Sequence, residues 1–278
     1  MRSWLSTPSP RPPQLDVELE QTHLQRLLEP LVAVDGRTEL TVGDDGLVAT
    51  SVDEAMTTSV EAALHQSLCH DYEAAPGSIV IDAAALLDAV DGERDDDSLA
   101  QLTYTPDGST LTLSLPSFVH TQTVDIDVTT ERPDIDNPSD SVTTYHPQDD
   151  LAHALECFTD RSSIVAFGYD DVDDECYLEA VSTSEAASKI TTRYRCSRER
   201  RPNSSTPGPA RSTFSTAKLR AIVDTAPPST MIRADYADSF PIRLAWDLTG
   251  ESGIDEGTLT EVTMLLAPRD AVDTAEGE

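Results

Sequence analysis

The sequence predicts an α+β protein made of two similar halves. Short apolar runs with the alternation typical of strands recur along the chain, separated by four segments in which apolar residues have helical spacing. The same order of elements starts again after a polar segment with two prolines, residues 129–141. A chain of 278 residues has room for two such domains of about 130 residues each.

The first half is predicted to contain two helices among its strands. One helix spans residues 22–34, with Thr22 as its N-cap and Pro30 as a kink. Its leucines share one face: Leu24, Leu27, Leu28 and Leu31. The other helix spans residues 82–90 and starts at the cap Asp82. Strands are predicted at residues 38–42, 47–52, 57–68, 78–81, 99–105, 110–115 and 118–128, with turns at 43–46 and 106–108.

The second half repeats this order. Helices at residues 150–158 and 216–224 correspond to the first two, so that Leu151 takes the place of Leu24 and Leu219 that of Leu86. Strands are predicted at residues 163–169, 176–182, 189–196, 231–236, 241–248 and 259–267. Two unrelated α+β domains are the alternative. The shared order of elements favours an internal duplication.

The charge of the chain is strongly negative. Asp and Glu number 51 against 19 Lys and Arg, for a formal net charge of −32. Disorder is one interpretation of such acidity. However, 38% of the residues are apolar and fall in regular patterns, which favours a folded protein with an acidic surface, as in a salt-rich cytoplasm. In molar salt the Debye length is about 3 Å, so repulsion between surface carboxylates is largely screened.

Cysteine usage and hydropathy narrow the class of protein further. The four cysteines, at positions 69, 157, 176 and 196, form no Cys-x-x-Cys pair, so we expect reduced thiols rather than zinc knuckles or disulfides. No apolar run reaches the roughly 18 residues that a membrane helix needs. Residues 1–15, with four prolines, and residues 270–278 are expected to be flexible tails. We expect a cytoplasmic protein without membrane contact.

Signals for catalysis or metal binding are weak. The trio His65, Cys69 and His70 lacks a further ligand at fixed spacing, and the acidic run 170–175 lacks the Gly and the final Glu of a calcium loop. No Gly-rich phosphate loop or Gly-x-Ser-x-Gly elbow occurs. Dispersed acids such as Asp82 and Asp150 are explained as helix caps. We therefore expect no enzyme activity, no cofactor and no metal.

Four segments carry a family resemblance. They are FSTAKLRAIVDTAP (214–227), ADSFPIRLAWDL (237–248), EVTMLLAPRD (261–270) and LVATSVDEAM (47–56). Taken in their order along the chain, and with a linker between two halves, these segments make the chain resemble the DNA sliding clamps of the proliferating cell nuclear antigen (PCNA) type over about residues 16–270. The ending Leu266-Ala267-Pro268-Arg269 is similar to the characteristic terminus of that family.

The resemblance implies a duplicated sliding-clamp fold. Clamp domains would span residues 16–128 and 142–269, joined by the connecting loop 129–141, with helices lining a central pore and sheets forming the outer wall. It also implies a homotrimeric ring around double-stranded DNA, without catalytic residues. Its partners would be DNA polymerase, clamp loader, ligase and flap nuclease, bound through short peptide motifs.

The resemblance also implies roles for individual residues. The DNA-binding residues would be Arg26, His153, Lys218 and Arg220. The partner-binding pocket would use Val52, Ile135, Pro241, Leu265, Ala267 and Pro268. The subunit interface would use Phe118, Arg193 and Arg195. Ordinary core packing is the alternative for Val52 and Leu265, whereas Ile135 is a lone apolar residue in a polar linker.

Two features depart from the family. The pore helices carry few bases: the second has none and contains Asp88, and the third has His153 and Glu156 where bases are common. Bound cations between carboxylates and phosphates are one substitute for these bases. The alternative is a weaker grip on DNA in a divergent paralogue or mobile-element protein with a repair, checkpoint or regulatory role.

The second departure is the arginine cluster of residues 193–201, which predicts contact with DNA, the loader or a neighbouring subunit. We favour the interface for Arg193 and Arg195 and leave Arg198, Arg200 and Arg201 open.

Overall fold

The computed structural model describes ten stretches of the chain: residues 14–34, 37–92, 98–105, 109–125, 141–159, 162–173, 175–181, 193–198 (backbone only), 209–250 and 260–269. The predicted turn at 106–108, most of the linker with Ile135, and the arginines Arg200 and Arg201 lie outside the described residues.

The described residues of the first half form two α-helices, one 3-10 helix and nine strands. In chain order these are β1 (Gln14–Glu20), α1 (Gln21–Val32), β2 (Arg37–Val42), β3 (Gly46–Val52), β4 (Thr58–His65), η1 (Gln66–Leu68), β5 (Cys69–Ala75), β6 (Gly77–Ile81), α2 (Ala83–Asp91), β7 (Leu99–Thr105), β8 (Thr110–Ser114) and β9 (Val119–Thr123).

The second half follows the same plan. It contains β10 (Val142–Pro147), α3 (Gln148–Thr159), β11 (Ile164–Asp170), β12 (Glu175–Val181), β13 (Arg193–Arg198), β14 (Ala210–Ser215), α4 (Thr216–Val223), β15 (Met231–Tyr236), β16 (Ile242–Asp247) and β17 (Glu261–Leu266). None of the described helices is long and apolar enough to cross a membrane.

The strand order shows the duplication. In the second half it runs β17-β16-β15-β10-β13-β12-β11-β14 without a break, because β13 pairs with β12 through Arg193–Cys196 and with β10 through Ser197 and Arg198. In the first half the equivalent order is β9-β8-β7-β1-β5, then β4-β3-β2-β6. The 3-10 helix η1 divides one strand into β4 and β5. The chain therefore has the duplicated α+β architecture that the sequence predicts.

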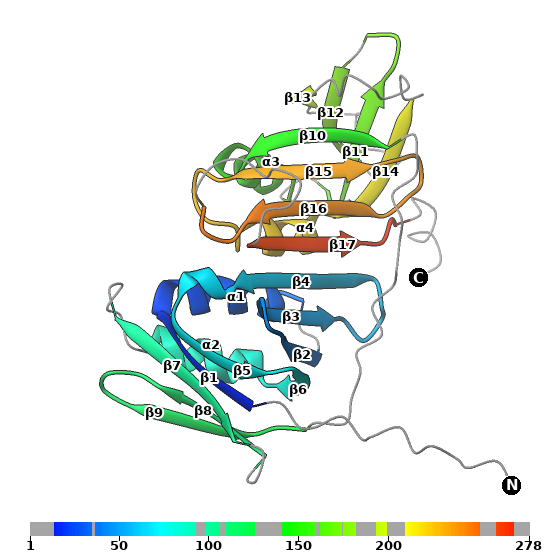
Figure 1. Cartoon of the computed structure of the whole chain (residues 1–278). Helices are drawn as coiled ribbons and strands as arrows, with labels where there is room; N and C mark the ends of the chain where they lie inside the picture. The colour runs from blue at the N-terminus through cyan, green and yellow to red at the C-terminus, as the bar shows by residue number, and fades with distance from the viewer. Residues whose placement is uncertain are drawn as a thin grey trace, which may run out of the picture.

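The two halves are joined by strand pairing. β17 of the second half pairs antiparallel with β4 of the first, from Val262 opposite Ala62 to Leu266 opposite Thr58. A single sheet of 12 strands therefore crosses the middle of the molecule. We call the pairing of β4 with β17 the seam. In Figure 1 it lies between the orange-red strands of the second half and the cyan strands of the first, and the helices of both halves lie behind the strands.

Helix packing against the sheets buries the core. α1 packs on α2 and α3 packs on α4. The four leucines predicted to face the core from α1 are each about 1% exposed. Leu151 and Leu219 occupy the equivalent places in the second half and are fully buried. Removing these apolar surfaces from water supplies the main driving force for folding.

Several local predictions are wrong. Thr22 lies inside α1, whose N-cap is Glu20 without a side-chain hydrogen bond, because β1 runs directly into the helix. Pro30 is accommodated within α1, which continues to Val32. Asp150 lies in the first turn of α3 rather than at its cap. Asp82, by contrast, caps α2 as predicted, accepting a hydrogen bond of 2.9 Å from the Ala85 amide.

The boundaries of some strands also differ. Four strands were not predicted, β1, β5, β10 and β14. In β1 the buried positions alternate with acidic residues, so its apolar content is low. The long strand expected at residues 118–128 is the five-residue strand β9, and Val124 follows it outside the strand.

Candidate functional site

A cavity of about 460 Å³ lies where the two halves meet. Three segments line it: Ala55 and Thr57 of the β3–β4 loop, Ser215 and Lys218 at the start of α4, and residues 266–269 after β17. The site is therefore shared between the halves.

The residues that follow β17 are held on both sides by backbone hydrogen bonds. The Ala267 amide donates to the Thr57 carbonyl at 2.7 Å, across the seam. The Arg269 amide donates to the Thr213 carbonyl at 2.7 Å, and the Thr213 hydroxyl donates to the Arg269 carbonyl. This wall of the cavity therefore depends on the relative position of the two halves.

The opposite wall is an ordered loop built on Asp53. One carboxylate oxygen of Asp53 accepts the amides of Thr57 and Thr58 at 2.7 and 2.9 Å, and the other accepts the Thr57 hydroxyl at 2.7 Å. At the tip, Met56 has a φ of 53° and its side chain is 58% exposed. The loop thus presents an apolar side chain beside the cavity while its own polar groups are paired.

Lys218 ties this loop to α4. Its ammonium lies 2.8 Å from the Asp53 carboxylate and 2.8 and 3.2 Å from the hydroxyls of Thr57 and Thr58. Burial raises the pKa of Asp53, but the hydrogen bonds from Lys218, Thr57 and Thr58 outweigh it and lower that pKa to about 2. The Asp53 carboxylate is therefore ionised throughout the neutral range.

The other bases predicted to contact DNA also have partners. Arg26 of α1 donates to the Thr249 carbonyl at 2.5 Å. Arg220 lies 3.7 Å from Glu156 of α3 and 3.4 Å from Asp224 of its own helix. His153 is exposed on α3, with its Nε2 3.8 Å from the Cys157 sulfur.

The helices expose more carboxylates than bases. The exposed acids on the described helices and their ends are Glu20, Asp82, Asp88, Asp91, Asp149, Asp150, Glu156 and Asp224. Between α1 and α2, Gln25 donates to both Asp91 and Glu29, at 3.0 and 3.2 Å. Burial and the neighbouring Asp91 raise the pKa of Glu29. The helical side of the molecule is thus acidic, as the sequence predicts.

None of the known protein-family profiles matches the chain. Curated relatives do: a DNA polymerase sliding clamp of Natronomonas pharaonis is 26% identical over 81% of this chain and 86% of its own length. One of Haloarcula marismortui is 23% identical over 88% of this chain and 94% of its own.

Solved structures agree on the fold. A. fulgidus PCNA bound to the C-terminal region of FEN-1 has a TM-score of 0.75, with 18% identity over 92% of this chain and 98% of that one. PCNA from Thermococcus kodakaraensis has a TM-score of 0.74, with 16% identity over 92% of this chain and all of that one. The chain therefore has the clamp fold of PCNA and is similar in sequence to DNA polymerase sliding clamps.

The clamp distributes the predicted partner-binding residues over two adjoining surfaces. Ala267 and Pro268 line the cavity. Val52 and Leu265 both lie opposite Ser59 in the sheet, so they share the face directed away from Leu266 and the core. Pro241 is half-buried and precedes Ile242, the partner of Leu266. Ile135 lies outside the described residues.

Five residues that line the cavity were not assigned to a site from the sequence: Ala55, Thr57, Ser215, Leu266 and Arg269. Four of them lie within quoted motifs of the resemblance, and Thr57 directly follows one. The pairing of Asp53 with Lys218 joins positions 165 residues apart, so no local pattern could have revealed it.

The clamp has two strand edges of interest. β9 pairs with β8, and no other described strand pairs with it; Phe118 and Val119 beside this edge are 39% and 61% exposed. In β13, Arg193 lies opposite Glu179 and Arg195 opposite Tyr177 of β12. The orientations of the Arg193 and Arg195 side chains are outside what the structure describes.

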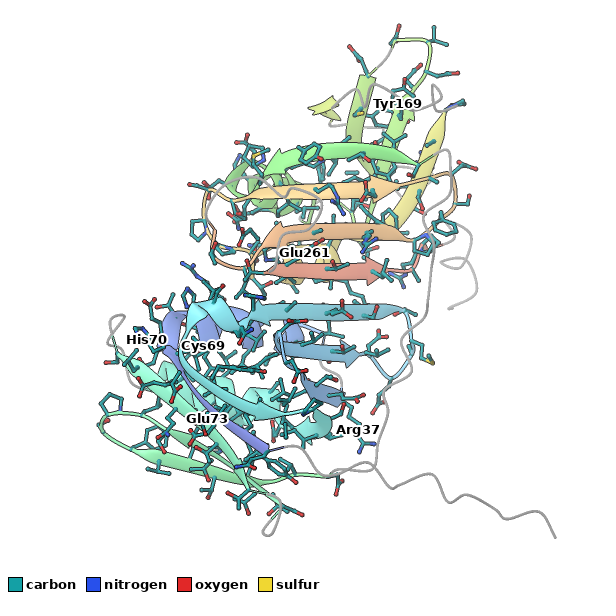
Figure 2. The ribbon with its side chains drawn as sticks, viewed as in Figure 1. Arg37, Cys69, His70, Glu73, Tyr169 and Glu261 are labelled. Carbon is teal, nitrogen blue, oxygen red and sulfur yellow. The ribbon has the colours of Figure 1, made fainter. Side chains whose placement is uncertain are left out.

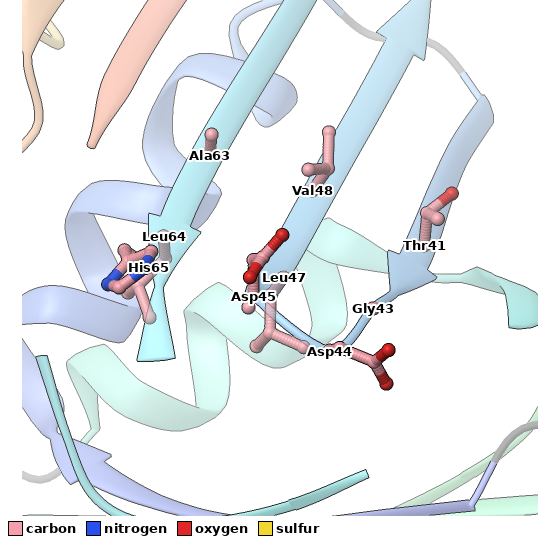
Figure 3. A pocket seen from close by; sticks show the side chains of 10 residues that line it. Thr41, Gly43, Asp44, Asp45, Leu47, Val48, Ala63, Leu64 and His65 are labelled. Carbon is pink, nitrogen blue, oxygen red and sulfur yellow. The ribbon is translucent and has the colours of Figure 1, made fainter. Parts of the chain in front are cut away.

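A second hollow, of about 300 Å³, lies at the tip of the β2–β3 hairpin (Figure 3). Gly46, with a φ of 146°, packs so closely on the end of β4 that a Cβ atom would lie 2.2 Å from the Leu64 carbonyl oxygen. The Tyr72 hydroxyl donates to the carbonyls of Gly43 and Gly46 at 2.6 and 2.8 Å. The lining is mainly backbone and aliphatic, and the described contacts assign it a structural role.

No group of three His, Cys, Asp or Glu among the described residues is arranged to hold a metal ion. Figure 2 shows Cys69 and His70 adjacent at the start of β5. Burial raises the pKa of the Cys69 thiol to about 11, so it stays protonated. The nearby His65 bonds to Ser67 instead, with Nδ1 2.9 Å from the hydroxyl.

Proposed function

We infer that this protein is a DNA sliding clamp: a ring around duplex DNA that serves as a processivity factor and tether for polymerase and other replication and repair proteins. Its relatives carry the description "DNA polymerase sliding clamp" over more than four fifths of the chain. That shared description favours the replicative role over a paralogue or mobile-element protein with a regulatory role. Such a clamp binds and slides and has no catalytic centre, and its place of action is the cytoplasm, with the DNA.

The observation that carries this proposal is the repetition of the sheet edges. β17 closes the seam by pairing with β4, and β9 occupies in the first half the place that β17 occupies in the second. The counterpart of β4 is the Arg193–Cys196 stretch of β13, which pairs with β12 on one side. A second copy can therefore place its β9 against this stretch and repeat the seam between subunits.

Repetition of such a head-to-tail contact closes a ring when its rotation divides a full turn. We propose three subunits, which gives six similar domains around the ring. Phe118, Arg193 and Arg195 would then lie at the subunit interface. The exposed Val119 beside the β9 edge supports an apolar contribution to this contact.

For partner binding, we propose the cavity at the seam and the sheet surface beside it. A peptide of the pattern Gln-x-x-aliphatic-x-x-aromatic-aromatic would place its polar residue near Ala267 and Pro268 and its apolar anchors on Val52, Leu265 and Pro241. Ile135 of the connecting loop would cover the anchors. Polymerase, clamp loader, ligase and flap nuclease would share the site. FEN-1 bound to A. fulgidus PCNA through its C-terminal region is an example in a structural neighbour.

For DNA, we propose that the helices face the duplex and that the grip is topological. His153 and Arg220, from α3 and α4, would make phosphate contacts, and the acidic surface around them would keep these contacts weak. A closed ring needs no strong contact to remain on DNA, because dissociation requires opening of the ring.

The test is retention on closed DNA. The protein would be loaded onto a nicked circular duplex in molar KCl with a clamp loader from a haloarchaeon, and the circle isolated by gel filtration. We expect retention on the circle and rapid loss when a restriction enzyme linearises it. Equal loss from circular and linear DNA would reject the clamp function.

A further inference from the structure

The seam between the two halves carries a cationic tie at each end. The strand pairing of β4 with β17 runs from Ala62 opposite Val262 to Thr58 opposite Leu266. Near the Thr58 end, Lys218 of the second half reaches the β3–β4 loop of the first. Near the other end, Arg26 of the first half reaches the β16–β17 turn of the second. Each half thus extends one base from a helix into a loop of the other.

The tie at Lys218 is fully paired. Its ammonium has three oxygen acceptors within 3.2 Å, one from each of Asp53, Thr57 and Thr58. The Asp53 side chain is only 12% exposed, whereas that of Lys218 is 45% exposed. An ammonium has three protons, so these three acceptors leave it little capacity for a phosphate.

The tie at Arg26 reaches Thr249, which Asp247 holds in place after β16. Asp247 accepts the Thr249 amide at 2.7 Å and the hydroxyls of Thr249 and Thr260 at 2.8 and 3.3 Å. Arg26 adds a hydrogen bond to the carbonyl of the same Thr249. The contact joins residues 223 positions apart, and it fixes α1 to the second half.

The corresponding helix positions at the free edges lack these ties. By the equivalence of Leu24 with Leu151, the counterpart of Arg26 is His153, which is exposed and within 3.8 Å of Cys157. By the equivalence of Leu86 with Leu219, the counterpart of Lys218 is Ala85. Arg26 and Lys218 therefore lie at the seam within the chain, and neither has an Arg or Lys counterpart at the free edges.

We propose that Lys218 and Arg26 are positioning residues that lock the seam, and that Lys218, through Asp53 and the 53–57 loop, sets the wall of the partner cavity. This role differs from the phosphate contact expected from the sequence, and its effect on binding rests on the proposed partner function. The cavity is lined by Lys218, by the loop that it holds and by Ala267, whose amide bonds across the seam. Loss of the tie would free this loop before a peptide binds, and the peptide would then have to order it.

The test uses variants that distinguish positioning of the cavity from contact with DNA by the direction of their effects on binding. Lys218→Met removes the tie, Asp53→Asn weakens it while leaving the lysine charge free, and Lys218→Arg retains a base. Asp44→Asn is the matched control, because it removes one exposed carboxylate at the other end of β3. Trimer mass and far-UV circular dichroism verify that each variant is folded.

If Lys218 positions the cavity, both Lys218→Met and Asp53→Asn should weaken binding of a FEN-1 C-terminal peptide by about fivefold, the cost of ordering roughly one side chain. The double variant should be no weaker than either single variant, because both remove one interaction. Lys218→Arg should recover most of the affinity, and Asp44→Asn should match wild type. Equilibrium binding to a short linear duplex, which depends on direct phosphate contacts, should be unchanged in all of them.

If Lys218 instead contacts DNA, Lys218→Met should weaken equilibrium binding to a short linear duplex and Asp53→Asn should strengthen it, with peptide affinity unchanged; that result would overturn the proposal. Amide hydrogen exchange gives a readout that does not depend on the peptide. Exchange at Thr58 and Ala267 should accelerate in Lys218→Met and Asp53→Asn, and exchange at Thr249 in Arg26→Met. Unchanged exchange would refute the lock even if the wild type binds no peptide, whereas accelerated exchange without peptide binding would refute only the partner function.

Discussion

The two halves of the clamp reach one topology with different cores. The largest fully buried side chains of the first half are Tyr104 and a set of leucines. Those of the second half are aromatic: Trp246, Tyr169, Tyr236, Phe158, Phe167 and Phe214. The same strand order therefore depends on where apolar residues fall and on the volume they fill, and not on their identity.

The halves also differ at the strand that joins their two sheet segments. In the first half η1 divides this strand into β4 and β5, whereas β13 continues from one segment to the other. β4 pairs with β17 along the seam, and β5 pairs with β1 in the other sheet. The equivalent stretch of β13 is the edge that we assign to the next subunit. One fold thus provides an internal joint and an external one.

The largest effect should come from breaking the external joint. We expect Arg193→Glu combined with Arg195→Glu to convert the proposed trimer into monomers, because two charges reverse sign at each subunit interface while the internal seam is untouched. Light scattering after gel filtration in molar KCl measures this. Arg211→Glu, on exposed β14, is the matched control and should remain trimeric. A trimer in both variants would reject this edge as the interface.

The aromatic core can be compared with the aliphatic core by truncation. Phe167 makes edge-on contacts with Phe214 and Tyr236, at ring centroid distances of 6.0 and 5.7 Å. We expect Phe167→Ala to lower the free energy of unfolding by about 4 kcal/mol, and Leu27→Ala in the first half by about 3 kcal/mol. Denaturant titration at fixed salt would measure both. A smaller loss for Phe167→Ala would show that the aromatic core repacks more easily than the aliphatic one.

Low pH should lower the stability of the second half in particular, because His146 is buried there. Burial lowers its pKa from 6.5 to about 4, and its Nε2 lies 2.8 Å from the Thr144 hydroxyl. The unfolded chain therefore binds a proton below pH 6.5 that the folded chain excludes, and stability should fall as pH drops from 6.5 towards 4. At pH 5 the loss from this residue should be about 2 kcal/mol. Unfolding as a function of pH checks it: His146→Phe should flatten the slope between pH 6.5 and 5, and an unchanged slope would contradict the assignment.

A glycine of each half provides a comparison of close packing. The Tyr177 ring lies over Gly168, where a Cβ atom would be 2.2 Å from it. Gly168→Ala should therefore cost about 2 kcal/mol of stability. Gly92 ends α2 with a φ of −66° and only ordinary contacts, so Gly92→Ala should stabilise by about 0.5 kcal/mol. Thermal melting of the two variants should move in opposite directions; a shift of the same sign in both would contradict the packing argument.

The smallest effect concerns the connecting loop between the halves. If Ile135 covers the partner's anchors, Ile135→Asp should weaken peptide binding by about 1 kcal/mol, as expected for loss of an interface anchor. Fold and trimer mass should be unchanged, since the loop belongs to neither core. Titration of the peptide in high salt against both proteins measures it. Equal affinities would remove Ile135 from the site.

The sequence by itself determined the class and the duplication. Leucines at helical spacing in α1 and apolar alternation in β3 and β7 are local patterns, and local patterns survive in any context that offers a core. Asp82 capped α2 as predicted for the same reason, since its acceptor serves an amide three residues away. The ending Leu266-Ala267-Pro268-Arg269 was sufficient, with three other motifs, to indicate the family.

Only the tertiary structure decided what the bases do and where the chain is joined. Strand β1 was missed because its apolar content is low, and it forms because β5 and β7 pair on either side of it. Lys218 and Arg26 were predicted to contact DNA, and the structure shows that their hydrogen-bond partners within the chain lie 165 and 223 residues away. The physical reason is that a charge is paired by whatever the fold brings within a few ångströms, and that distance in space is not encoded by spacing along the chain.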